Sequence, residues 1–272
     1  MDLPVTKFDL LFLGLGRMGL PMAGHALRGG LSIKGYDPDP ARMALFSDEG
    51  GDAVRNLGEA IETADAMLIM VGSEKQVTDL VEGPDGIAVR ARPGSLVLVT
   101  STVSPKFVHS LGERLAERGI RVVDAPVCRA EMGAVSGTLL TLLSGARPDC
   151  EDAERLMKPF SADIENVGER LGAAQIAKTV NNMILWAAVT ANYEGFLLAD
   201  EWGLDVEALR RALITSSADN WSLRHWDHIG KMRWSLKDME IALATGREFN
   251  IALPLSEAVE TQLRTLPLLN HA

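Results

Sequence analysis

The sequence has few cysteines, no clustered metal ligands and no surplus of positive charge. Cys128 and Cys150 form no CxxC pair, and the five histidines form no HExxH pattern. We therefore expect neither a disulfide framework nor a metal site. Lysine and arginine number 27 against 37 aspartates and glutamates, a formal net charge of −10. Because binding to a nucleic-acid backbone requires clustered positive charge, we expect no nucleic-acid partner.

The chain also lacks long hydrophobic runs. No apolar stretch reaches the roughly 18 residues that a membrane helix requires. The opening residues, MDLPVTKFD, have neither the basic nor the apolar region of a secretory signal. We therefore expect no membrane partner and a cytoplasmic location. The 272 residues, 47% hydrophobic and 24% charged, are typical of a globular chain with one large domain or two smaller ones.

Short apolar runs alternate with amphipathic stretches in the first half of the chain. The expected strands are 9–13, 32–36, 66–71, 96–100, 121–124 and 138–143. This alternation of expected strands and helices predicts an α/β domain over 1–166, with a parallel sheet covered by helices on both faces. Between about 172 and 202 there is no proline, which predicts one long helix, and the rest of the chain has only helical patterns. We therefore expect an all-helical domain over 167–272, joined to the first domain by this helix.

A glycine-rich turn follows the first expected strand. In LFLGLGRMGLPMAGHAL (11–27), Gly14, Gly16 and Gly19 have the spacing GxGxxG. This spacing permits a tight turn, close approach of a pyrophosphate and close packing of the next helix, whose first N–H groups point at the phosphates. A strand–turn–helix without a ligand has the same spacing, but the position at the N-terminus after an apolar strand favours a dinucleotide.

An acidic residue follows at the distance that a dinucleotide site requires. Asp37 ends the second expected strand, where it can hydrogen-bond the adenosine ribose. A carboxylate there repels a 2′-phosphate, so we expect NAD to be preferred. NADP is the alternative, because Arg42 lies close in sequence and can offset the charge. The turn residues expected at the cofactor are Gly14, Leu15, Gly16, Arg17, Met18 and Gly19.

Four segments in order resemble the β-hydroxyacid dehydrogenase family, which includes 3-hydroxyisobutyrate dehydrogenase and tartronate semialdehyde reductase. They are the glycine turn, DAPVCRAEMGAVSGTL (124–139), GAAQIAKTVNN (172–182) and LKDMEIAL (236–243). They resemble the N-terminal signature, the substrate loop, the catalytic-lysine signature and the C-terminal motif of the family. The resemblance implies a Rossmann-type dinucleotide-binding domain, a long interdomain helix and a helical domain. It also implies a homodimer or homotetramer that transfers hydride between NAD(P) and a small β-hydroxy acid or related semialdehyde.

The resemblance makes Lys178 the general acid–base. Oxidation of an alcohol by hydride transfer requires a group that takes the hydroxyl proton and returns it in the reverse direction. Asn182 lies four residues later on the same helix face and can orient the lysine or the substrate. Asn181 is expected at the substrate. The alternative is an ordinary solvated lysine, but two adjacent asparagines disfavour a helix and so suggest a function for at least one.

The resemblance also implies cofactor contacts from three other segments. They are Val71, Gly72, Gln76, Thr102 and Lys237. Two structural alternatives remain open here. Ser101 and Thr102 can instead cap the helix that follows at Pro105. Lys237 and Asp238 can instead be a solvated pair on a helix surface.

The substrate loop departs from the family pattern. Where the family has Ser-Gly-Gly, this chain has Cys128, Arg129 and Ala130. A thiol is a weaker hydrogen-bond donor than a hydroxyl. Arg129 can hold a carboxylate with two hydrogen bonds, or it can point outward and pair with Glu131. All three residues are expected at the substrate, whose identity the departure leaves open.

Two other functions fit parts of the sequence. One is an imine reductase-like enzyme, known among relatives of this fold, in which the lysine is usually replaced. The other is a non-catalytic reader, a protein that binds NAD or a histone-like partner and catalyses no reaction. Lys178 and Asn182 are both retained here, which favours the dehydrogenase.

Overall fold

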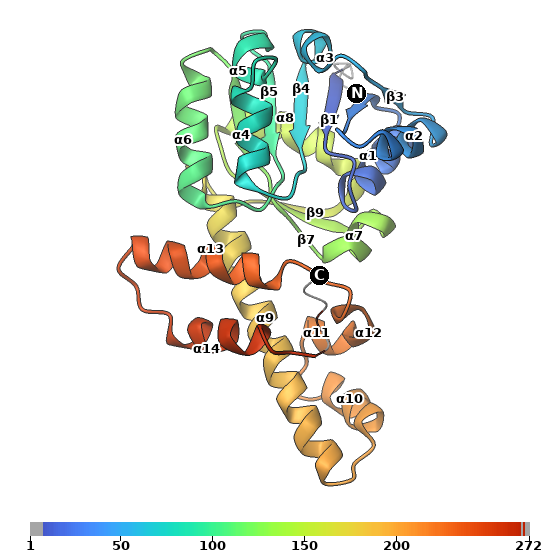
Figure 1. Cartoon of the computed structure of the whole chain (residues 1–272), viewed down its shortest axis with the longest axis vertical. Helices are drawn as coiled ribbons and strands as arrows, with labels where there is room; N and C mark the ends of the chain where they lie inside the picture. The colour runs from blue at the N-terminus through green and yellow to red at the C-terminus, as the bar shows by residue number, and fades with distance from the viewer. Residues whose placement is uncertain (1–7, 268, 270–272) are drawn as a thin grey trace, which may run out of the picture. The chain divides into compact units, whose positions relative to one another are not determined.

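A computed structural model describes residues 8–267 and 269 of the chain. The chain divides into two compact units, Met1–Lys178 and Thr179–Ala272 (Figure 1). The first is an α/β unit, and helices are the only regular elements among the described residues of the second, so the predicted fold class is confirmed. The division into domains at residues 166 and 167 stays a prediction of the sequence.

The first unit is built on a parallel sheet in the order β3-β2-β1-β4-β5-β6. Its strands are β1 (Asp9–Leu13), β2 (Ser32–Tyr36), β3 (Asp52–Ala53), β4 (Ala66–Ile69), β5 (Leu96–Val99) and β6 (Arg121–Asp124). The strand order reverses between β1 and β4. Ligands of such sheets bind in the crevice outside the carboxyl ends of the strands at this switch point, where the glycine turn lies.

Helices cover both faces of this sheet because its strands are buried on both sides. They are α1 (Gly19–Arg28), α2 (Pro40–Asp48), α3 (Leu57–Thr63), α4 (Glu74–Glu82), α5 (Ile87–Arg90), α6 (Pro105–Ala116) and α8 (Arg147–Met157), with the 3-10 turn η1 (Lys158–Phe160). Successive side chains of a strand point to opposite faces. Leu10 and Phe12 accordingly join one buried cluster, and Leu11 and Leu13 join the other.

A second, three-stranded sheet carries the expected substrate loop. Its strands are β7 (Val127–Cys128), β8 (Leu139–Leu143) and β9 (Ser161–Asn166), and the short helix α7 (Ala130–Ser136) lies between β7 and β8. β8 runs antiparallel to β7 and parallel to β9. The strand expected at 138–143 therefore exists, but its assignment to the parallel sheet is wrong. Pairing between Asp124 and Ser144 connects the end of β6 with the end of β8.

The second unit contains most of α9 (Ala173–Glu201), the long helix expected from the sequence. The helices that follow are α10 (Val206–Ile214), α11 (Trp221–Arg224), α12 (Trp226–Ile229), α13 (Ser235–Glu248) and α14 (Pro254–Leu263). Trp186, Val189, Met239 and Leu263 are central in its buried core. The described residues contain no helix that is both long and apolar enough to cross a membrane. They also contain no cluster of side chains able to hold a metal ion.

Candidate active site

The three glycines of the turn between β1 and α1 each meet a different constraint. Gly14 has φ +101°, and a Cβ there would lie 2.2 Å from the carbonyl oxygen of Met70. A Cβ on Gly19 would lie 1.9 Å from the carbonyl oxygen of Gly14. A Cβ on Gly16 would meet no atom of the described residues within 4 Å, its chain neighbours aside. Gly14 and Gly19 are thus required by the fold itself, whereas at Gly16 the backbone faces open space. The open space beside the backbone of Gly16, called the cradle below, fits a dinucleotide pyrophosphate, and a side chain at Gly16 would fill it.

The N-terminal end of α1, the helix that follows the glycine turn, also suits an anion. α1 begins after Met18, and no side chain of the described residues caps it. The N–H groups of a first helical turn lack partners within the helix and favour negative charge. This arrangement suits the phosphates of a dinucleotide.

Asp37 lies directly beside the glycine turn. Its carboxylate accepts the backbone N–H of Leu15 at 2.8 Å and that of Asp39 at 2.9 Å. These bonds fix the carboxylate at the end of β2, next to the crevice of the sheet. Arg42 follows in α2, where it is partly exposed.

Arg17 contacts the expected substrate loop. Its Nε and one terminal nitrogen lie 2.7 and 2.6 Å from the same carboxylate oxygen of Glu131, in the first turn of α7. The glycine turn and the substrate loop are therefore linked by an ion pair whose side chains remain 40% and 44% exposed.

The loops after β4 and β5 lie side by side. The backbone N–H of Val71 donates to the Ser101 hydroxyl at 2.8 Å, and that of Gly72 donates to the Gln76 side-chain oxygen at 2.8 Å. Thr102 is partly buried in the second loop. The alternative that Ser101 or Thr102 caps the helix at Pro105 is wrong. Ser104 caps it, accepting the N–H of Phe107.

The backbone of the expected substrate loop is strained. Arg129 and Ala130 have φ values of +82° and +54°, in the left-handed region that glycine tolerates and other residues rarely adopt. The guanidinium of Arg129 donates to the carbonyl of Thr138 at 2.9 Å and to the carboxylate of Asp163 at 2.5 Å. The alternative that Arg129 pairs with Glu131 is therefore wrong, because Arg129 pairs with Asp163 on β9.

Lys178 lies beside this loop. Its Nζ is 3.9 Å from the sulfur of Cys128, a long and weak hydrogen bond, and Cys128 is buried. Cys128 belongs to a small apolar cluster with Leu142 and Ala174, against which Leu140 packs. The first unit thus brings the lysine, the loop and the glycine turn into one compact body.

A buried carboxylate that the sequence analysis missed holds the first turn of α9. Asp124 is fully buried, and it accepts from Gln175, Ser144 and the backbone of Gly172. Burial raises the pKa of Asp124 to about 6, while the hydrogen bonds from Gln175 and Ser144 act in the opposite direction. The available signals were weak: an acidic residue ending an apolar strand, and one glutamine in the apolar run GAAQIA.

The second unit carries the other three expected site residues. Asn182 is buried, and its side-chain oxygen accepts from the Asn181 amide at 3.0 Å. Lys237 is in α13, with its Nζ 5.5 Å from the ring centre of Trp234. The neighbouring Asp238 accepts from the Trp186 indole N–H at 3.0 Å, so the alternative of a merely solvated pair is wrong for Asp238.

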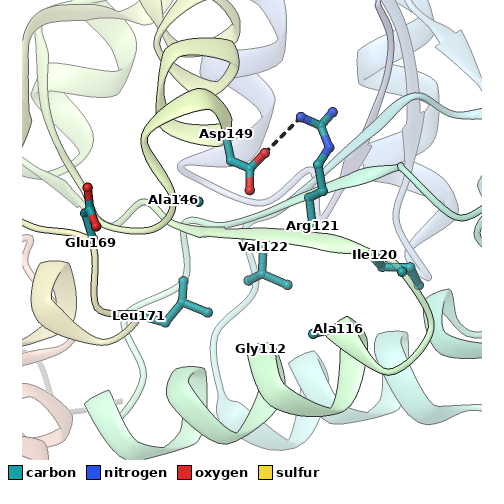
Figure 2. Close-up of a pocket in the computed structure, with 10 residues that line it drawn as sticks. Gly112, Ala116, Ile120, Arg121, Val122, Ala146, Asp149, Glu169 and Leu171 are labelled. Atoms are coloured by element: carbon teal, nitrogen blue, oxygen red, sulfur yellow. Dashed lines mark hydrogen bonds and ion pairs between the residues drawn. The ribbon is translucent and has the colours of Figure 1, made fainter.

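A pocket of about 420 Å³ lies elsewhere in the first unit, between α6 and β6 (Figure 2). Apolar side chains such as Val122 and Leu171 line it, and an ion pair of Arg121 with Asp149 at 3.0 Å borders it. None of the described residues that line this pocket is an expected site residue. It is therefore separate from the crevice at the glycine turn.

Two family models match consecutive parts of the chain. The NAD binding domain of 6-phosphogluconate dehydrogenase matches residues 9–168. The NAD-binding domain of NADP-dependent 3-hydroxyisobutyrate dehydrogenase matches residues 172–269.

Named relatives cover most of the chain. An L-threonate dehydrogenase of Cupriavidus necator is 29% identical over 95% of this chain and 90% of its own. An NAD-dependent L-serine dehydrogenase of Pseudomonas aeruginosa is 31% identical over 79% of this chain and 72% of its own. The solved structure of a 3-hydroxyisobutyrate dehydrogenase from Salmonella typhimurium shares the fold, with a TM-score of 0.84 at 24% identity over 95% of this chain and 93% of that chain. An imine reductase from Streptomyces aurantiacus also shares this fold, with a TM-score of 0.69 at 19% identity. The match covers 94% of this chain and 93% of that chain.

Proposed function

Because the chain belongs to the β-hydroxyacid dehydrogenase family, we propose that it interconverts a small β-hydroxy acid and the related semialdehyde, with NAD preferred and Lys178 as general acid–base. The chain is an NAD(P)-dependent oxidoreductase that acts on CH–OH donors. The observation that carries the finer proposal is the contact of Lys178 with Cys128, the first residue of the expected substrate loop.

The bound dinucleotide supplies the hydride acceptor or donor at its nicotinamide ring. Gly14, Gly16 and Gly19 and the start of α1 hold its pyrophosphate, and the backbone at Leu15, Arg17 and Met18 completes the cradle. Val71, Gly72 and Thr102 border it from the loops after β4 and β5, and Gln76 borders it from the first turn of α4. Lys237 is a further proposed cofactor contact.

The preference for NAD rests on Asp37. Its carboxylate accepts two backbone N–H groups, which supports a role in which the adenosine ribose hydroxyls donate hydrogen bonds to it. A 2′-phosphate at the same place would bring like charges together, which destabilises the complex. Arg42 is the residue through which NADP would be tolerated.

Lys178 takes the hydroxyl proton during oxidation and returns it during reduction. Asn182 lies one helical turn later and orients the lysine or the hydroxyl. The substrate acid group lies at Cys128, Arg129, Ala130 and Asn181. Because Asp163 and Thr138 already engage the guanidinium of Arg129, the backbone of the loop is the part best able to bind the carboxylate.

An imine reductase-like activity is the second candidate, and the shared fold supports it. The retained Lys178 favours an alcohol, which must lose a proton as hydride leaves. A non-catalytic NAD-binding protein would have no use for a lysine beside the loop. A homodimer or homotetramer is supported by an exposed apolar stripe along α9, comprising Val180, Ile184, Leu198 and the adjoining Trp202.

The experiment that tests the proposal is a turnover assay. The purified protein is mixed with NAD⁺ or NADP⁺ and with 3-hydroxy acids that differ in size and charge, among them 3-hydroxyisobutyrate, L-serine and L-threonate. Reduction of NAD⁺ with at least one acid supports the proposal. Reduction of cyclic imines by NADH or NADPH, with no oxidation of any acid, would favour the second candidate.

A further inference from the structure

We propose that Asp124 and Gln175 are positioning residues that fix the position of Lys178 relative to the loops expected at the dinucleotide. The hydrogen bonds of Asp124, Ser144 and Gln175 are called the network below. The proposal rests on the proposed role of Lys178. Neither residue contacts the expected reacting atoms in the structure, so both act through the helix that carries the lysine.

The first turn of α9 is capped by side chains from elsewhere in the fold. Asp124, at the end of β6, accepts the backbone N–H of Gln175 at 3.0 Å and that of Gly172. The hydroxyl of Ser144, after β8, accepts the N–H of Ala174 at 3.0 Å and donates to Asp124 at 3.2 Å. A helix end usually obtains these bonds from its own N-cap residue. Here they tie the first turn of α9 to two different sheets.

The side chain of Gln175 extends this connection to the cofactor loops. Its Nε2 donates to Asp124 at 2.8 Å and to the carbonyl of Ser101 at 3.1 Å, and its Oε1 accepts the N–H of Val103 at 3.1 Å. The Ser101 hydroxyl in turn accepts the N–H of Val71. The loops after β4 and β5, expected to border the dinucleotide, are thereby bonded to the start of the helix.

Lys178 lies one turn beyond Gln175 on the same helix. Residues three apart share a helix face, so a displacement of the first turn moves the lysine with it. A misplacement of about 1 Å can reduce a rate about 100-fold. The network therefore determines how far the lysine stands from the path of hydride transfer, and it does so without touching the substrate.

A purely structural network would affect only stability. The two roles are separated with Gln175→Met, which preserves volume but removes the hydrogen bonds of the amide, and with Asp124→Asn. The matched control is Ser161→Ala, which breaks the buried 2.7 Å bond between Ser161 and Thr141 in the other sheet. Turnover, NADH affinity, thermal stability and amide hydrogen exchange over residues 172–180 are measured for all three variants.

We expect both network variants to lower kcat about 10- to 100-fold while NADH affinity changes less than about 3-fold. Amide exchange in the first turn of α9 should accelerate about 10-fold or more in both. The control should lose stability, with kcat within about 2-fold of the wild type. Unchanged exchange, or faster exchange with kcat like that of the control, overturns the proposal.

The test also separates this proposal from the proposed function. If the wild type binds NADH but oxidises none of the acids, the proposed function fails on its own. The rate at which acetic anhydride labels Lys178 in the NADH complex then reports its position. Gln175→Met should change that rate about 3-fold or more relative to the control, and equal rates overturn the positioning role.

Discussion

The side-chain nitrogen of Lys178 lies 3.9 Å from the sulfur of Cys128. The group proposed to move the proton thus contacts the residue at which this chain departs from the serine of its family. A thiol donates a weaker hydrogen bond than a hydroxyl. The contact therefore joins the proposed acid–base to a residue that we propose at the substrate.

Cys128→Ser should improve turnover of short 3-hydroxy acids. The hydroxyl supplies a hydrogen bond to the acid group or the lysine, which is expected to raise kcat/KM about 3- to 10-fold. Steady-state kinetics on the acid panel measure the change. Cys128→Ala is the control, because it removes the sulfur without adding a donor. An equal rise in both variants would show that bulk at residue 128, not hydrogen bonding, limits turnover.

Two glycines of the turn should respond to alanine in opposite ways. In Gly19→Ala the new methyl group would clash with the carbonyl of Gly14, so we expect a loss of stability of about 2 kcal/mol or more. In Gly16→Ala it meets open space, so stability should change by less than about 0.5 kcal/mol. NADH affinity should nevertheless fall about 10-fold or more in Gly16→Ala. Thermal melts and NADH titrations measure both effects, and undiminished affinity in Gly16→Ala would contradict the pyrophosphate cradle.

The charge of Asp37 should set the preference for NAD. Asp37→Asn retains an oxygen that can accept the N–H of Leu15 but removes the negative charge. We expect the ratio of kcat/KM for NADP⁺ to that for NAD⁺ to rise about 10-fold or more. Asp39→Asn, in the cap of α2, is the control and should leave the ratio unchanged. A ratio that is equal in Asp37→Asn and the wild type would assign the preference elsewhere.

Asp124 should lower the free energy of unfolding as the pH rises from about 4 to 6, because its pKa is raised in the folded protein. Its pKa in the folded protein, about 6, exceeds the ordinary value of 3.8, so the folded state binds the proton more tightly than the unfolded state. The contribution of Asp124 to the free energy of unfolding therefore falls as pH rises from about 4 to 6, by about 1.4 kcal/mol per unit of pKa difference. Urea unfolding of the wild type and Asp124→Asn across this range measures it. A difference between the two that is constant with pH, or that grows as pH rises, would contradict the assignment.

The sequence predicted the elements that local patterns encode. The apolar runs predicted five strands of the parallel sheet, and the proline-free stretch from about 172 to 202 predicted α9. Each of these patterns depends on burial along a single element, which the local sequence shows. The strand β9 was missed because SADIEN is mostly exposed. Without a buried face, its sequence does not alternate between apolar and polar residues as a half-buried strand does. The second sheet was missed with it, and 138–143 was therefore assigned to the wrong sheet.

The side-chain partners of the site could not be predicted in the same way. The sequence left Glu131, two residues away, as the alternative partner of Arg129. In the structure Arg129 pairs instead with Asp163, and Glu131 pairs with Arg17, both far along the chain. Asp124 and Gln175 are 51 residues apart and meet only when β6 and α9 are in place. Such contacts depend on tertiary packing, which no local pattern records.

The proposed role of Lys178 is tested by comparing the wild type with Lys178→Ala in two assays. We expect NAD⁺-dependent oxidation of the best acid to fall about 100-fold or more in the variant, because a general acid–base contributes about 100- to 10,000-fold. We expect fluorescence titration to find an NADH affinity within about 3-fold of the wild type, since the glycine turn is intact. A variant that binds NADH equally well and retains its turnover would contradict the role of Lys178.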